Sequence, residues 1–221
     1  MANKANPTER AEAARRRLLA LSAEKAAKLL DPATEEFSTH GYTGASLNRI
    51  LASAGMSKGQ AYYYVTGKAD LYLAACERAF APIAEVAGPV PGTLPDAATF
   101  WLEVMGLIEK MSVLGQETGP ISDLGRTVYE SPESEAALAP LIKRVEAYLT
   151  DWIKLGQRSG AVRTDLPDEL LQTSLLGLLS VMDRWFSKNC EDYSRPQLEA
   201  MNRAAFQMLR AAASPPDVSN A

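Results

Sequence analysis

The chain has 221 residues, of which 47% are hydrophobic and 23% charged, an ordinary composition for a globular protein with a sizeable core. No stretch approaches the ~20 apolar residues of a membrane-spanning helix, and the first ten residues lack the apolar core of a secretory signal. We therefore expect a cytoplasmic protein. Cys76 and Cys190 lie far apart in apolar stretches, which indicates buried free thiols in a reducing compartment.

Charge is distributed unevenly around the net value of −4. Residues 1–75 carry 10 Lys and Arg against 7 Asp and Glu, whereas the rest of the chain carries 13 against 20. Residues 37–69 hold no Asp or Glu but include Arg49, Lys58 and Lys68. A basic N-terminal part on an acidic body is the asymmetry expected when one end of a protein meets nucleic-acid phosphate.

Residues 1–21 form a basic extension with Arg10, Arg15, Arg16 and Arg17 among alanines. We expect this extension to be partly disordered. Its arginines have two interpretations: a solvated tail, or an arm that adds phosphate attraction or enters a minor groove.

Apolar residues recur at helical spacing across residues 22–39, and Ser22 is placed to cap the start. Pro32 lies inside this pattern, where it removes one backbone hydrogen bond. Either the helix kinks there, or a fresh helix starts at Asp31 with Pro32 in its first turn. Gly41 is expected to end the helix in a left-handed conformation.

Two short helices joined by a tight turn are predicted over residues 46–54 and 57–65. Ser46 is the expected N-cap or first-turn residue of the first helix, and Ser57 is the expected N-cap of the second. Gly55 lets the chain turn sharply between them. This is the sequence form of a helix-turn-helix, whose second helix enters the major groove of DNA.

The second of these helices has an unusual outward face. Successive helical residues point about 100° apart, which turns Ala61, Tyr64 and Val65 inward. The remaining, outward residues are Lys58, Gly59, Gln60, Tyr62 and Tyr63. Glycine allows the backbone to approach DNA, glutamine can pair with adenine, and tyrosine can contact a thymine methyl group or phosphate. We expect these five residues to contact DNA.

The rest of the chain reads as further helices, predicted at residues 69–86, 96–114, 121–130, 132–159, 167–189 and 196–213. A Pro/Gly-rich loop at residues 88–95 is the clearest internal boundary, and no alternating run of strand length occurs. We therefore expect an all-α chain. Its domains would be a helix-turn-helix domain at residues 22–75, a larger helical domain at residues 76–213 and a disordered tail at residues 214–221.

Large aromatic and methionine side chains of the second domain are candidates to line an adaptable apolar site between helices. They are Trp101, Met105, Ile108, Met111, Tyr129, Tyr148, Trp152, Met182, Trp185 and Phe186. The alternative for each of them is ordinary core packing.

A set of landmarks at matching spacing covers about fifty residues: Ala33, Phe37, Gly41, Tyr42, Ile50, Ala54, Gly55, Met56, Ser57, Gly59, Tyr62, Lys68 and Leu71. With these landmarks, residues 26–75 resemble the DNA-binding domain of the TetR family of transcriptional regulators. The resemblance implies a homodimer whose three-helix N-terminal domain precedes a helical domain that binds a small molecule. It also implies DNA contacts from Ser46 and Asn48 and a phosphate anchor at Lys68.

The resemblance further implies dimerisation through the last two long helices, whose apolar stripes suit a four-helix interface. The expected partner is double-stranded DNA with a pseudo-palindromic operator, read by two helices in successive major grooves. A small, largely apolar effector would release the protein from that operator. No membrane partner is expected.

Catalytic chemistry finds little support in the sequence. The single histidine, His40, stands at a helix exit, and the cysteines lack partners at metal-ligand spacing. No phosphate-binding or dinucleotide-binding fingerprint is present, so we expect no cofactor. Our hypothesis is a ligand-responsive regulator, most simply a repressor, and not an enzyme. The alternatives are a small-molecule-binding or enzymatic protein with a vestigial helix-turn-helix, and a constitutive architectural DNA binder.

Overall fold

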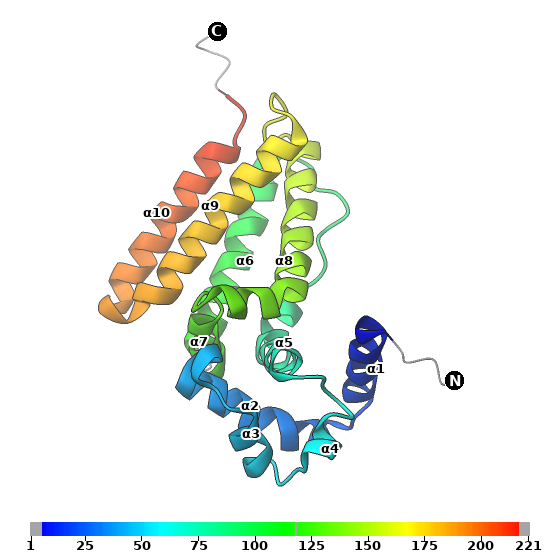
Figure 1. Cartoon of the computed structure of the whole chain (residues 1–221). Helices are drawn as coiled ribbons and strands as arrows, with labels where there is room; N and C mark the ends of the chain where they lie inside the picture. The colour runs from blue at the N-terminus through cyan, green and yellow to red at the C-terminus, as the bar shows by residue number, and fades with distance from the viewer. Residues whose placement is uncertain (1–5, 118, 217–221) are drawn as a thin grey trace. The chain divides into compact units, whose positions relative to one another are not determined.

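The computed structural model describes residues 6–117 and 119–216, and every regular element in that part of the chain is helical (Figure 1). The expected all-α fold is therefore confirmed. Of the tail expected to be disordered, residues 217–221 lie outside the described part. No helix of the described part is both long and apolar enough to cross a membrane.

Contacts divide the chain into two compact units: residues 1–82 with 115–141, and residues 83–114 with 142–221. The first unit is therefore larger than the domain expected at residues 22–75. It includes residues 115–141, which the sequence analysis assigned to the second domain.

The first unit contains α1 (Pro7–Leu19), α2 (Ala23–Gly44), α3 (Leu47–Ser53), α4 (Lys58–Ala61), most of α5 (Lys68–Ala87), α7 (Gly119–Thr127) and the start of α8 (Pro132–Arg158). Fully buried side chains from these helices form its core, among them Leu29, Phe37, Ile50, Leu71, Tyr72, Leu124 and Leu138. The Tyr72 ring lies 4.8 Å from that of Phe37 and 4.9 Å from that of Tyr42. Its hydroxyl bonds the Thr127 hydroxyl of α7 at 2.7 Å, so α7 is tied into the same core.

The basic extension forms helix α1 over residues 7–19, where partial disorder was expected. Ala14 and Leu18 are buried, and Arg15 makes an ion pair with Glu77 of α5 at 2.6 Å. An apolar face and a long-range ion pair therefore order a segment whose composition alone indicates a tail. Residues 1–5 lie outside the described part.

Helix α2 runs through Pro32 without a fresh start at Asp31. The non-helical residue inside α2 is Gly41, with φ 66° and ψ 176°. The predicted positive φ at this glycine is confirmed, but the backbone is extended in ψ, and one further turn follows to Gly44. A side chain from outside the helix, that of Glu130, occupies the space beside Gly41.

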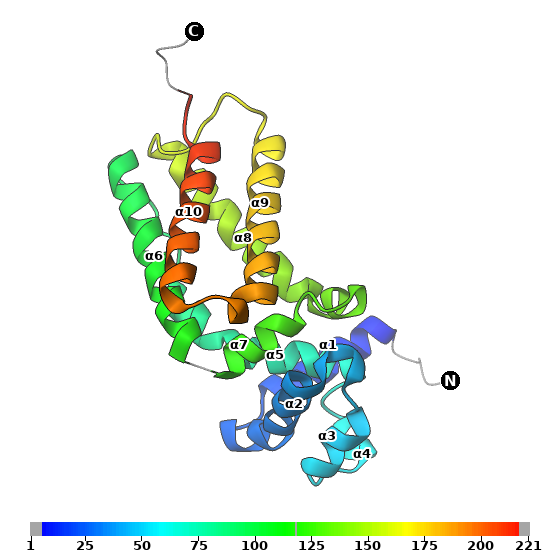
Figure 2. The ribbon, with the colours of Figure 1, turned by 90° about the vertical axis from the view of Figure 1, so that its left-hand side faces the viewer.

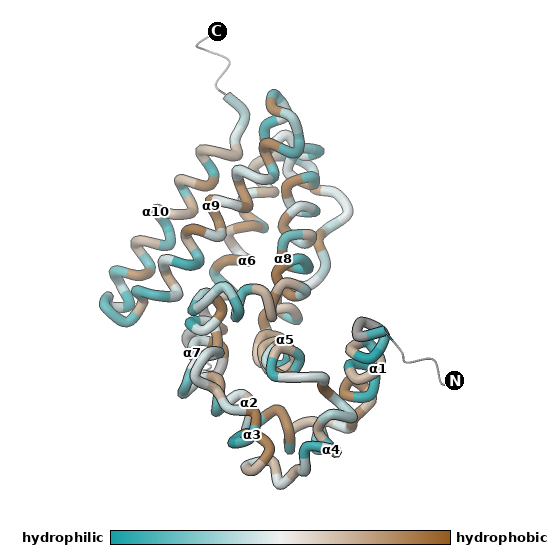
Figure 3. The backbone as a smooth tube through the Cα atoms, viewed as in Figure 1, coloured by the Kyte–Doolittle hydropathy of each residue, from teal (hydrophilic) through white to brown (hydrophobic). Residues whose placement is uncertain are grey.

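The second unit contains most of α6 (Ala97–Glu117), the rest of α8, α9 (Asp168–Asn189), the short turn η1 (Cys190–Asp192) and α10 (Arg195–Ala213). These bounds lie within three residues of the predicted helices. Helices α9 and α10 lie side by side (Figures 1 and 2). Apolar and polar residues alternate along α8 and α9, as expected for helices with one buried face (Figure 3).

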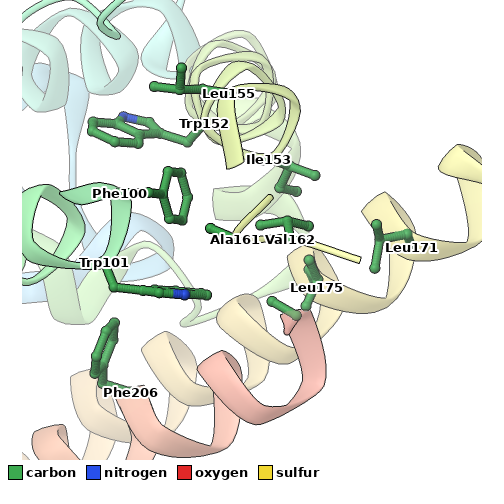
Figure 4. Close-up of a cluster of buried hydrophobic side chains, with 11 residues drawn as sticks. Phe100, Trp101, Trp152, Ile153, Leu155, Ala161, Val162, Leu171, Leu175 and Phe206 are labelled. Atoms are coloured by element: carbon green, nitrogen blue, oxygen red, sulfur yellow. The ribbon is translucent and has the colours of Figure 1, made fainter. Parts of the chain in front are cut away.

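An aromatic cluster forms the core of the second unit (Figure 4). The Phe100 ring contacts Trp101 and Trp152 edge to face, with centroids 5.0 and 5.9 Å apart. A β-carbon at Gly156 would lie 2.3 Å from a methyl group of Val162, so the cluster is closely packed there. Both cysteines are free; Cys76 is buried as expected, whereas Cys190 is only half-buried.

Candidate nucleic-acid interface

The first helix of the predicted motif begins at the expected cap. The Ser46 hydroxyl accepts a hydrogen bond from the Arg49 amide at 3.4 Å, and the Ser46 amide donates to the Glu36 carboxylate at 2.7 Å. Of the two positions expected for Ser46, the N-cap is the one it occupies. The hydroxyl and the backbone amide of Ser46 are thus both hydrogen-bonded within the fold, where they stabilise the start of α3. Asn48, one residue into α3, is exposed.

The turn that follows has the predicted glycine geometry, with φ 61° at Gly55. The next helix is shorter than the predicted 57–65: α4 ends at Ala61 and continues only as turns. Gly59 and the tyrosines are weak helix formers, so four residues of helix need the support of a good cap. Val65 then enters the core, where it is 1% exposed.

That cap is a reciprocal one, which the prediction from the sequence did not include. The backbone N–H of Gln60 donates to the Ser57 hydroxyl at 3.3 Å, and the backbone N–H of Ser57 donates to the side-chain Oε1 of Gln60 at 2.8 Å. The serine-x-x-glutamine spacing is the signal that could have revealed it. A bidentate pair with adenine needs the same side-chain oxygen, so the expected role of Gln60 in base reading competes with its capping role.

The outward face of the motif agrees with the helical periodicity. Lys58 and Gly59 are exposed, and the tyrosine side chains Tyr62 and Tyr63 are 48% and 54% exposed. Nothing lies within 4 Å of a β-carbon placed at Gly59, so a DNA backbone or base could approach it. Large aromatic groups exposed beside a bare backbone form a surface suited to a nucleic acid, and their contact with DNA stays a prediction.

Lys68 does not stand free for phosphate. Its ammonium group donates to the carbonyl oxygens of Tyr42 at 2.8 Å and of Thr43 and Ala45 at 3.3 Å each. Carbonyl groups at the end of a helix lack partners within that helix, and a cation satisfies them. The structure therefore gives Lys68 the task of closing α2, in place of the phosphate anchor that the resemblance implies.

Arg49 is engaged as well. Its guanidinium group forms a fork on the Glu36 carboxylate, with the shortest contact 2.5 Å, and also donates to the Gly44 carbonyl at 2.9 Å. The hydrogen bond from Arg49 lowers the pKa of Glu36. Residues 37–69 contain no acidic residue, but the fold places the Glu36 carboxylate against Arg49 of this stretch. Of its three cations, Lys58 is the one with neither an ion pair nor a carbonyl contact among the described residues.

The ten candidate ligand residues do not form one site. Trp101 and Trp152 are in the core cluster of the second unit, and Ile108 and Tyr148 pack against it. The others are scattered: Met105 and Trp185 are exposed, Met111, Met182 and Phe186 are half-buried, and Tyr129 belongs to the first unit. Adjacent large residues on one helix point in different directions, so composition alone cannot group them.

Two surface hollows of about 510 and 200 Å³ both lie in the first unit, and none of the ten candidates lines them. Most residues that line the larger hollow are polar, among them Asp31, Thr34, Glu35 and Thr39 from α2 and Arg78 from α5. No group of three or more metal-ligating side chains that could hold an ion occurs in the described part.

A capped helix, a tight glycine turn and a short second helix that exposes lysine, glycine and two tyrosines define a helix-turn-helix protein that binds DNA. Residues 29–75 match the family model described as bacterial regulatory proteins of the tetR family. The HTH-type transcriptional repressor AcnR of Corynebacterium glutamicum is 27% identical over 168 residues, covering 73% of this chain and 79% of AcnR. AcnR of Corynebacterium efficiens is similar to the same extent.

Solved structures agree on the fold. A protein described as a tetR family transcription regulator from Shewanella sp. PV-4 superposes with a TM-score of 0.63 at 19% identity, covering 86% of this chain and 97% of the other. MexZ, a repressor from Pseudomonas aeruginosa, gives 0.56 at 22% identity over 86% and 96%. Residues 29–75 are thus similar to the DNA-binding domain of tetR family regulators, and the chain is a DNA-binding transcriptional regulator.

Proposed function

We propose that the protein is a repressor that binds a palindromic operator as a homodimer and is released by a small, largely apolar ligand. The observation that carries the proposal is the exposed surface of α4 and of the turn that follows it, which presents Lys58, Gly59, Tyr62 and Tyr63. We assign the DNA contacts to these four residues, to Asn48, and to Gln60 through the part of its side chain not used in the cap. Similar proteins that are described as repressors, AcnR and MexZ, support repression over activation.

Exposed apolar side chains on α9 and α10 support dimerisation. Leu170, Val181, Trp185 and Met208 are 41% to 67% exposed, although they are large and hydrophobic. Exposed apolar surface on two neighbouring helices is typical of an interface, and a second copy would complete a four-helix bundle. Binding in two successive major grooves would require the two α4 helices of the dimer to lie about 34–36 Å apart on DNA.

A buried polar atom in the second unit supports the ligand. Trp152 is only 9% exposed within the aromatic cluster, and its Nε1–H group has no hydrogen-bond partner in the described part of the chain (Figure 4). An unpaired buried donor is costly, so an apolar molecule with one acceptor atom would find a favourable place there. Replacing Trp152 by Phe keeps an aromatic ring but removes the N–H donor, so the affinity for that ligand should fall.

Footprinting of the full chain on DNA selected from a random library tests the operator. The expected result is a protected inverted repeat, and Lys58→Ala should weaken its binding. Protection without two-fold symmetry, or undiminished binding by the variant, would contradict the proposal.

Native mass spectrometry of the purified protein measures the dimer mass and a retained small molecule together. Val181→Glu should shift the protein to monomers, because a charge would be buried in the interface. Lys143→Glu, a charge change on an exposed residue of α8, serves as the control. A wild-type monomer at micromolar concentration would contradict the dimer.

A further inference from the structure

Tyr63 lies in a stretch that needs support from outside. Helix α4 ends at Ala61, and the Tyr63 amide makes only a long, turn-type bond of 3.3 Å to the Gln60 carbonyl. Tyr63 is 54% exposed, and its ring packs perpendicular to that of Tyr64 with centroids 5.1 Å apart. An exposed aromatic group on irregular backbone does not hold one orientation by itself.

Arg17 of α1 supplies that support. Its guanidinium carbon lies 4.3 Å from the centre of the Tyr63 ring, and its Nη1 donates to the Tyr63 carbonyl at 3.1 Å. The same side chain thus covers the ring and satisfies the carbonyl. A planar guanidinium group can do both, since it stacks on an aromatic face and donates in its own plane.

Helix α1 is itself anchored to the unit. Ala14 and Leu18 are buried, and Arg15 is paired with Glu77. Arg17 therefore projects from a fixed platform, 46 residues away along the chain from its contact. The contact fits neither interpretation of the basic extension: Arg17 belongs neither to a solvated tail nor to a mobile arm.

We infer that α1 supports the DNA-binding surface and that Arg17 is a positioning residue, which holds Tyr63 in the orientation that meets DNA. This inference rests on the proposed operator binding through α4. Arg17 acts through Tyr63 and not chiefly as a phosphate contact, so its removal should reduce affinity while the salt dependence of binding stays the same. Holding the ring beforehand reduces the ordering that binding would otherwise require.

The test measures the affinity of the full-length protein by fluorescence anisotropy, as a function of salt. The probe is a duplex that the wild-type protein selects from random-sequence DNA. Arg17→Ala is compared with Arg16→Ala, which removes the same charge from the neighbouring exposed position. Arg17→Lys keeps the charge without the planar group, and serves also if Arg17→Ala fails to fold. Tyr63→Ala and the double variant with Arg17→Ala complete a cycle.

We expect Arg17→Ala to weaken binding by about five- to tenfold, and Arg16→Ala by less than about twofold. The double variant should lose less affinity than the product of the two single effects, and the salt slope of Arg17→Ala should equal that of the wild type. Two results would instead show a direct phosphate contact and overturn the inference. In one, the effects of the two single variants on affinity multiply in the double variant; in the other, the salt slope of Arg17→Ala is reduced by about 0.9 for each Arg17. Equal behaviour of the Arg16 and Arg17 variants would overturn it too. If the wild type selects no sequence, operator binding itself fails, which is a different result.

Discussion

The Lys68 ammonium group lies 2.8 Å from the Tyr42 carbonyl oxygen and 4.7 Å from the centre of the Tyr42 ring. One side chain thus joins the first residue of α5 to the last turn of α2. The Tyr42 ring in turn contacts Tyr72 in the core. Lys68 therefore joins the two helices that flank the helix-turn-helix, α2 before it and α5 after it.

Replacing Lys68 by Met should destabilise the fold and leave the salt dependence of DNA binding nearly unchanged. Hydrogen bonds to a charged group contribute about 1.5–3 kcal/mol, so chemical denaturation should show a decrease in unfolding free energy of that order. Lys58→Ala is the contrasting variant: normal stability, with a salt slope reduced by about 0.9 for each phosphate that Lys58 neutralises in the wild type. The reverse pattern for the two lysines would restore Lys68 as the phosphate anchor.

Gly59→Ala should separate DNA binding from folding. A β-carbon at this position meets nothing within 4 Å, and alanine favours a helix over glycine by about 1 kcal/mol, so unfolding should become no easier. The methyl group would occupy the surface offered to DNA, and operator affinity should fall at least tenfold. Gly125→Ala in α7, which is equally uncrowded, is the matched control and should bind normally. Unchanged DNA affinity of Gly59→Ala would show that DNA does not approach this backbone.

Gln60→Ala should lower stability, because it removes the reciprocal cap with Ser57. Removal of a helix cap costs about 0.5–2 kcal/mol, which denaturant titration can measure. Gln60→Glu keeps an acceptor at the same place and should retain most of the stability. If both variants are as stable as the wild type, the cap has no energetic role and Gln60 is available for base reading.

Gly41→Ala should be strongly destabilising for two separable reasons. The positive φ of 66° disfavours any residue with a side chain, and the new β-carbon would lie within 2.6 Å of the Glu130 carboxyl group. In a Glu130→Ala background the steric part disappears, so the two substitutions should be non-additive in free energy of unfolding. Gly44→Ala, whose β-carbon meets only an ordinary contact at 3.6 Å, is the control. Strictly additive effects would argue against the Glu130 contact.

The Arg49–Glu36 fork should make stability sensitive to acid. Because Arg49 lowers the pKa of Glu36 in the folded state, the contribution is fully present above the ordinary value of 4.5 and disappears as the pH falls below it. Wild type and Glu36→Gln should therefore differ in unfolding free energy at pH 7 and converge towards pH 3. A difference that stays constant with pH would exclude an electrostatic origin.

Local patterns were sufficient to predict the helices from α2 onward and their faces, but not α1. Apolar spacing predicted inward Ala61 and Val65, and the caps at Ser46 and Ser57 were visible as single residues before apolar runs. These features depend on neighbours within a turn or two, so they can be read along the chain. The exposed surface of α4 follows from the same periodicity.

The partners of the polar groups could not be predicted in this way. Lys68 reaches Tyr42 across 26 residues, Glu130 reaches the Tyr42 amide across 88, and Arg17 reaches Tyr63 across 46. Each pair meets only when helices distant in sequence pack together. The sequence by itself determined most of the helical segments from α2 onward and which residues of the helix-turn-helix are exposed. Only the tertiary structure decided which charged side chains are paired within the fold, because a charged group pairs with a group that helix packing brings within hydrogen-bond distance.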